Sequence, residues 1–291
     1  MSASPGAPGP GSAPPLPGLR EITPAHVVRW LAAGWRDFVR VPVASGLHGL
    51  LFLAGALAIV AIGWRDAGLL AGAFTGFVIV APVLVTGFHE LSRRLEAGEA
   101  PQPFGLLALI AVWKRRGAQL AALGGLLALA GTLWVGFSSM LVRLAGGSGA
   151  SAAGSAAAGG AGSASAGGVA GFVHQFLAAG DAWLLVWFLA GGLGAAIVFA
   201  VAAVSVPMLV DRPVPLTTAI RTSVAAVGLN PVSLGVWASA IMALTLLGFV
   251  TVVGLVVVLP VLGHATWHAY RDLVEPEGGK ASPAGTPRAG R

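Results

Sequence analysis

The chain has 291 residues, of which 56% are hydrophobic and only 10% are charged, and its formal net charge is +6. A soluble protein of this size would expose far more apolar surface than water tolerates, so the composition indicates a membrane protein. The absence of cysteine excludes disulfides, cysteine nucleophiles and cysteine metal ligands. The basic residues lie between apolar runs rather than in one patch, which argues against nucleic acid as a partner.

The two ends of the chain differ from its middle. Residues 1–19 are rich in Pro, Gly, Ser and Ala, lack the basic and apolar regions of a signal peptide, and are expected to form a disordered cytoplasmic tail. Residues 275–291 have a similar composition and the same expected state. Residues 20–274 are expected to form one membrane domain.

Apolar runs long enough to cross a bilayer predict the architecture. The run from Pro231 to Tyr270 is too long for one span, and it predicts two spans joined by a tight turn near 248–254. We therefore expect an all-α, polytopic membrane bundle of six transmembrane helices, with short interfacial helices on the cytoplasmic side. The other four predicted spans are Val43–Gly63, Ala67–Phe88, Gly117–Val142 and Ala182–Val206.

Lys and Arg residues alternate in number from one loop to the next. Counted by alternate segments, 15 lie on the side of the two termini and 2 on the other side. Cytoplasmic loops are enriched in these residues, so both termini are expected in the cytoplasm. The Ala- and Gly-rich composition, with Arg as the main basic residue, is typical of a GC-rich bacterial genome and indicates a bacterial inner membrane. An Ala/Gly/Ser-rich stretch at about 145–171 predicts a flexible periplasmic insertion.

A threefold repeat is one interpretation of the chain. Each pair of spans is preceded by an amphipathic segment, and each even-numbered span carries a proline followed by apolar residues. The alternative is coincidence, because proline is common in membrane helices. The amphipathic segments are Thr23–Val39, Gln102–Arg116 and Pro215–Gly228, and the prolines are Pro82, Pro207 and Pro260.

The first amphipathic segment has the clearest pattern. An apolar stripe of Val27, Leu31, Trp35 and Phe38 predicts a helix lying in the inner membrane interface. The arginines on another face would point towards anionic headgroups of the bilayer, and a groove in a membrane-protein partner or a second copy is the alternative. These arginines are Arg29, Arg36 and Arg40.

Four histidines are expected at one depth near the cytoplasmic boundary. His264 and His268 are spaced for one helix face, and His48 and His89 are predicted at a similar depth. Imidazole is a good ligand for zinc, copper or haem iron, so a divalent metal or haem is one hypothesis. The other is a structural collar at the membrane interface, formed with Trp267, Tyr270 and Arg271.

No catalytic motif stands out, and the sequence predicts a protein that is not an enzyme. The phosphate-binding loop, the zinc-protease helix and the nucleophile elbow are all missing from the sequence. Charged residues are also missing from the centres of the predicted spans, which counts against ion-coupled transport. We expect a non-enzymatic scaffold or accessory component, with a small-solute or lipid transporter and a haem- or metal-binding protein as alternatives.

Three stretches resemble a known family. The sequences LPVLGHATWHAYRDL at 259–273, WLAAGWRDFVRVP at 30–42 and SVPMLVDRPVP at 205–215 are similar to bacterial proteins described only as predicted integral membrane proteins with a domain of unknown function. The resemblance extends over about Leu19 to Val274, apart from the insertion. It implies a polytopic inner-membrane protein without an assigned activity.

Overall fold

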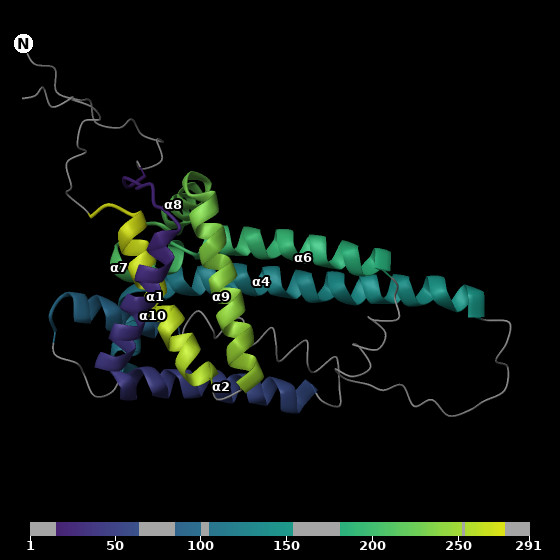
Figure 1. Ribbon diagram of the computed structural model, residues 1–291, viewed down its shortest axis with the longest axis horizontal. Coiled ribbons are helices and arrows are strands. Elements are labelled where there is room, and N and C mark those ends of the chain that lie inside the picture. The colour runs from purple at the N-terminus through teal and green to yellow at the C-terminus, as the bar shows by residue number, and fades with distance from the viewer. Residues whose placement is uncertain (1–15, 64–84, 100–104, 154–180, 252–253, 277–291) are drawn as a thin grey trace, which may run out of the picture.

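The computed structural model describes residues 16–63, 85–99, 105–153, 181–251 and 254–276 (Figure 1). Within these ranges every extended regular element is an α-helix, so the all-α prediction is confirmed for the described chain. Residues 85–96 are also helical. The named helices are α1 (Ala25–Arg40), α2 (Pro42–Gly63), α4 (Gly105–Ala153), α6 (Asp181–Ala202), α7 (Ser205–Asp211), α8 (Leu216–Leu229), α9 (Pro231–Thr251) and α10 (Leu255–Leu273).

The described helices account for fewer spans than the six expected. Three are long and apolar enough to cross a membrane by themselves, and a fourth is reached if the bent pair α1 and α2 is one span. Most of the predicted span Ala67–Phe88 lies outside the described residues. The three spans are Ile110–Ser138, Leu185–Asp211 and Pro231–Gly248.

The spans present apolar side chains to their surroundings. Leu133 on α4, Leu189 on α6 and Met242 on α9 each expose more than half of their surface. In water such exposure would be costly, whereas lipid tails are as apolar as these side chains. Figure 1 shows α4 and α6 running side by side, with their long outer faces uncovered. These faces are suited to contact with lipid.

Proline positions decide where the helices bend. The chain turns by 106° between α1 and α2. Pro42 begins α2, and Val41 before it leaves the helical region with φ −130° and ψ 56°. A proline lacks the N–H for the helical ladder and crowds the preceding residue out of the α conformation, so the helix cannot continue through this point. The same arrangement recurs at Asn230, with φ −126° and ψ 49°, before Pro231 and α9.

The second amphipathic segment is not a separate helix, which corrects the prediction for Gln102–Arg116. Its described part, 105–116, forms the first turns of α4 and continues without a break into the span. Pro42 and Pro231 follow the other two amphipathic segments, whereas no proline follows this one, so the chain lacks the residue that would force a bend. Residues 145–153 of the predicted insertion also belong to α4, and the rest of the insertion lies outside the described residues.

The helix α10 lies at the centre of the packing and contacts both α1 and α2 (Figure 1). Glycines allow this close approach. A Cβ atom on Gly34 of α1 would lie 2.5 Å from the carbonyl oxygen of Val261, and one on Gly49 of α2 would lie 2.4 Å from that of Val256. Both contacts are backbone to backbone, so α10 is held nearer to its neighbours than any larger residue would permit.

The two ends of the described chain lie side by side. Leu19 and Val274 form an antiparallel bridge, flanked by hydrogen bonds from the Arg20 amide to the Leu273 carbonyl and from the Glu275 amide to the Gly18 carbonyl, both 2.9 Å long. The side chain of Asn230 holds the same N-terminal segment, accepting from the Ile22 amide at 2.8 Å and donating to the Arg20 carbonyl at 3.1 Å. The N-terminal segment is thus tied to both α9 and α10.

Candidate functional site

The buried face of α1 differs from the predicted stripe. Only Val27 of the predicted stripe is buried, while Trp35 exposes 51% of its surface and stacks on Phe38. The face that packs on α10 is instead formed by Val27, Trp30, Gly34 and Asp37. Trp30 donates a hydrogen bond from Nε1 to Asp272 at 2.8 Å, which fixes the two helices together. The helix therefore uses one face for protein packing and leaves Trp35 and Phe38 partly uncovered.

A chain of buried hydrogen bonds joins α1, α2, residues 85–96 and α10. His264, which has no exposed surface, contacts Ser45 Oγ through Nε2 at 2.9 Å and Ser92 Oγ through Nδ1 at 2.8 Å. Ser92 donates to Asp37 Oδ2 at 2.7 Å, and Nε2 of His268 lies 2.8 Å from the same oxygen. The chain thus runs from half-buried His268 to fully buried Ser45.

The direction of donation along this chain follows from its acidic member. An ionised carboxylate only accepts, so the Ser92 hydroxyl proton points to Asp37 and its oxygen is left to accept from His264. The Nδ1 atom of His264 therefore carries the proton, and Nε2 accepts from the Ser45 hydroxyl. Neutral His264 with its proton on Nδ1 satisfies both of its hydrogen bonds to the serines. In this tautomer the basic nitrogen is Nε2, which faces Ser45.

The charge of Asp37 is maintained by its partners. Burial alone would raise the pKa of Asp37, but hydrogen bonds from His268 and Ser92, together with the nearby charge of His268, hold the pKa below its usual value. The side chain is 4% exposed and is therefore an ionised group kept inside the protein at neutral pH. Its compensation comes from hydrogen bonds rather than from an arginine or a lysine.

His48 and His89 lie nearby but take no part in the chain. His48 donates from Nδ1 to the Ala44 carbonyl at 2.8 Å, and its Nε2 has no partner among the described residues. Both rings are buried, and the ring of His89 lies against the backbone of Gly263 on α10. The ring of Phe88 contacts His48 at 5.4 Å and His264 at 5.5 Å between centroids. The four predicted histidines do gather in one region, with Phe88 between His48 and His264.

This gathering is not arranged as a ligand set. Within the described ranges, no group of three or more His, Asp or Glu side chains is placed to hold a metal ion. Both nitrogens of His264 already bond to serines, so a metal or haem iron would have to displace one of them.

The predicted collar residues are directed into the protein. Trp267 is 1% exposed and donates from Nε1 to Glu96 at 2.9 Å, and Tyr270 is fully buried and donates to Asp211 at 2.6 Å. Arg271 pairs with both acidic residues, at 2.9 Å from Glu96 and 3.6 Å from Asp211. These groups join α10 to residues 85–96 and to α7, and their expected contacts with headgroups stay a prediction.

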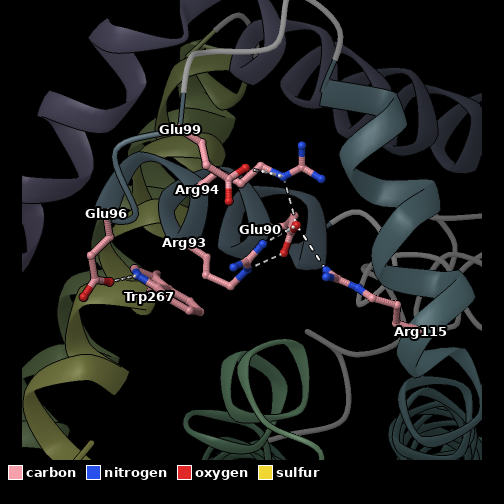
Figure 2. Close-up of polar contacts among 7 residues, drawn as sticks. All are labelled: Glu90, Arg93, Arg94, Glu96, Glu99, Arg115 and Trp267. Carbon is pink, nitrogen blue, oxygen red and sulfur yellow. Dashed lines mark hydrogen bonds and ion pairs between the residues drawn. The ribbon is translucent and has the colours of Figure 1, made fainter.

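A second polar centre surrounds Glu90 (Figure 2). Its carboxylate is fully buried and binds Arg93 at 2.8 Å, Arg94 at 2.9 Å and Arg115 of α4 at 3.2 Å. Burial alone would raise the pKa of Glu90, but the hydrogen bonds from Arg93 and Arg94 and the charges of Arg93 and Arg115 hold it below its usual range. One carboxylate thus fixes three arginines at the end of α4 and leaves a net positive charge there.

Sequence reasoning missed both centres. The spacing of Glu90 to Arg93 and Arg94 is that of neighbours on a helix surface and could have indicated the second one. For the hydrogen-bond chain around His264, no short sequence pattern singles out Asp37 or Ser92, because His264 is 172 residues from Ser92.

These features define a class of protein. A set of apolar helices with uncovered outer faces, enclosing a small buried polar chain, is an integral membrane protein of helical type. Residues 69–211 match a family model described as "Predicted integral membrane protein (DUF2189)", a family of unknown function. The resemblance inferred from the sequence is confirmed, although only 205–211 of the three stretches that suggested it lie within the matched range. No curated protein and no solved structure matches the sequence.

Proposed function

We propose that the protein is a six-span component of a bacterial inner membrane with both termini in the cytoplasm. The observation that supports an even number of spans is the pairing of Leu19 with Val274, because chain ends that pair lie on one side of the membrane. The helices α2 and α10 and the predicted span Ala67–Phe88 would join the three spans found by length and apolarity. The charge bias of the loops favours the cytoplasmic side for the ends.

Reporter fusions test this topology. A reporter fused after Arg291 should be active only as a cytoplasmic fusion, and one inserted near residue 160 should be active only as a periplasmic fusion. Periplasmic activity of the Arg291 fusion would refute the even-span proposal. Cytoplasmic activity of the insertion fusion would refute the placement of α4 and α6 as neighbouring spans.

We further propose a non-enzymatic role as a scaffold or accessory component that binds anionic headgroups through α1. Exposed Trp35 stacks on half-buried Phe38, on the helix that also carries exposed Arg36 and Arg40. Aromatic rings next to arginines are typical of helices at the lipid surface, where each basic residue contributes about 1 kcal/mol.

The headgroup proposal is tested by reconstitution. The full chain in phosphatidylglycerol vesicles should unfold at a higher temperature than in phosphatidylcholine vesicles. Replacing Arg36 and Arg40 with Gln should remove most of that difference. The matched control is Arg221→Gln on α8, another exposed arginine on an amphipathic helix, and an equal loss in the control would contradict a specific role for α1.

Transport of a small solute or lipid is the second candidate function. It is favoured by the repeated backbone geometry at Val41–Pro42 and Asn230–Pro231, since internal repeats are common in transporters. Flux of solute or labelled lipid in proteoliposomes above the rate of empty vesicles would favour transport over a scaffold.

Haem or divalent-metal binding through His48, His89, His264 and His268 stays an untested hypothesis. Its test is an absorption spectrum and elemental analysis of the purified full chain. A stoichiometric metal or haem absorption would support it, and neither being present would reject it.

A further inference from the structure

Two helix pairs of the fold can be compared position by position. Both pairs consist of an amphipathic helix, a single non-helical residue and a proline that begins the next helix. Asp37 lies five residues before Pro42, and Ala226 lies five before Pro231. Both residues are buried, with 4% and 0% of their surface exposed. The two matching positions are therefore similarly buried, but one holds a carboxylate and the other an apolar side chain.

The contrast continues beyond the proline. Ser45 lies three residues after Pro42 and His48 six after it, and both are buried. The matching residues after Pro231 are Leu234 and Trp237, each 1% exposed. Because apolar residues fill these positions in one pair, the architecture itself does not require polar ones. The polar set of the first pair thus has a purpose other than packing.

The chemistry of this set is that of proton transfer. Donation runs from Ser45 through His264 and Ser92 to Asp37, which also bonds to His268, and every link is between 2.7 and 2.9 Å. Chains of His, Asp and hydroxyl groups inside a membrane domain are characteristic of proton relays. The order also resembles that of a serine nucleophile and its base, but Ser45 is fully buried, which leaves proton sharing as the available chemistry.

We propose that His268, Asp37, Ser92, His264 and Ser45 form a proton relay between the half-buried end of α10 and the interior of the helical bundle. A proton entering at the Ser45 oxygen sends that group's own hydroxyl proton to Nε2 of His264, while Nδ1 of His264 gives its proton to Ser92 Oγ and Ser92 gives its own hydroxyl proton to Asp37. Asp37 then passes the proton to Nε2 of His268 when that nitrogen carries none. No bond between heavy atoms changes, and each group returns to its starting protonation state after the reverse transfer.

His48 is the next base beyond the relay. It follows Ser45 by three residues on α2, and its Nε2 is an acceptor without a partner among the described residues. Gly87 makes room for this ring, since a Cβ atom there would lie 2.6 Å from Nε2. A buried acceptor left open is costly, which agrees with a position that receives a proton in the working protein.

The titratable groups facing His264 come from each element that contributes to the site. They are Asp37 of α1, His48 of α2, His89 of residues 85–96 and His268 of α10 itself. Of these, Asp37 is the acidic group that faces the ring, so a proton held on His264 has a counter-charge that it reaches through Ser92.

The test is the exchange of the His264 Nδ1 proton with water, measured by NMR on the full chain labelled with ¹⁵N-histidine in lipid nanodiscs. In the Ser92→Ala variant, exchange should slow by roughly tenfold or more, because the path to the boundary is broken. A merely structural role for Ser92 predicts the opposite, because loosened packing admits water and speeds exchange. The direction of the change therefore separates the two roles.

Two further variants complete the experiment. Ser92→Thr keeps the hydroxyl and should retain exchange near the wild-type rate, and Ser239→Ala removes an exposed hydroxyl on α9 that bonds only within its helix and should change nothing. Exchange that is unchanged or faster in Ser92→Ala would overturn the relay. A wild-type His264 found with its proton on Nε2 would overturn it as well, since the order of donation would then be broken.

Discussion

Replacing Gly49 with alanine should push α2 away from α10. The added Cβ would lie 2.4 Å from the Val256 carbonyl oxygen and 3.0 Å from the carbonyl carbon and the Cα atom. Restoring an ordinary van der Waals separation requires about 1 Å of movement between two helix backbones. Neither atom belongs to a flexible side chain, so the two helices must shift as units.

Gly46, one turn earlier on α2, is the matched control because a Cβ there meets nothing within 4 Å. Alanine is favoured over glycine inside a helix by up to about 1 kcal/mol at either position. This gain is common to both variants and cancels in their comparison. The difference between them isolates the steric cost, for which overpacking gives roughly 1–3 kcal/mol.

The assay is reversible unfolding of the purified full chain in detergent, followed by tryptophan fluorescence. We expect Gly46→Ala to be as stable as the wild type or more stable, and Gly49→Ala to be the less stable of the two. Gly49→Ala with a stability equal to that of Gly46→Ala would refute the close backbone contact between α2 and α10.

Three other variants probe the polar centres. Because the pKa of Glu90 is lowered, its stabilisation is complete above its usual value of 4.5 and is lost as the pH falls through the lower folded value. Glu90→Gln should therefore flatten the dependence of stability on pH below about pH 5, as measured by thermal unfolding. Tyr270→Phe removes the bond to Asp211 and should cost roughly 1.5–3 kcal/mol in the same unfolding assay, and an unchanged midpoint would argue against that bond. Asn230→Ala should speed hydrogen exchange of the Ile22 amide by roughly tenfold, as measured by exchange mass spectrometry, while equal protection would show that the clamp is dispensable.

Some helices of the fold could be predicted from the sequence, and the course of others could not. The starts of α2 and α9 were within reach because a proline acts locally on its own residue and the one before it. The helical hairpin of α9 and α10 was predicted because a 40-residue apolar run is too long for one span. The straight course of α4 through Gly117 was missed, since an amphipathic pattern says nothing about whether the next residue bends the chain.

The site was harder to predict because its contacts are not local. Trp267 and Tyr270 were assigned to a membrane collar, since a ring with one polar group suits a wet interface and a buried hydrogen bond equally well. Glu96 and Asp211, which accept from Trp267 and Tyr270, come near these rings only after α10 has packed. In the same way, four histidines at one depth were predicted, but the serines that bond His264 were not.

The pairing of the first helix with the last has a consequence for the order of events during synthesis. Trp30 and its partner Asp272 are separated by 242 residues. At a translation rate of about 5–20 residues per second, α1 therefore waits for roughly tens of seconds before α10 exists. During that time Trp30 lacks its acceptor Asp272, and Asp37 lacks its partner His268. Docking of α1 against α10 is thus a late step, and a product that stops short of α10 would leave Trp30 without its hydrogen-bond acceptor and Asp37 without His268, a defect that quality-control proteases could recognise.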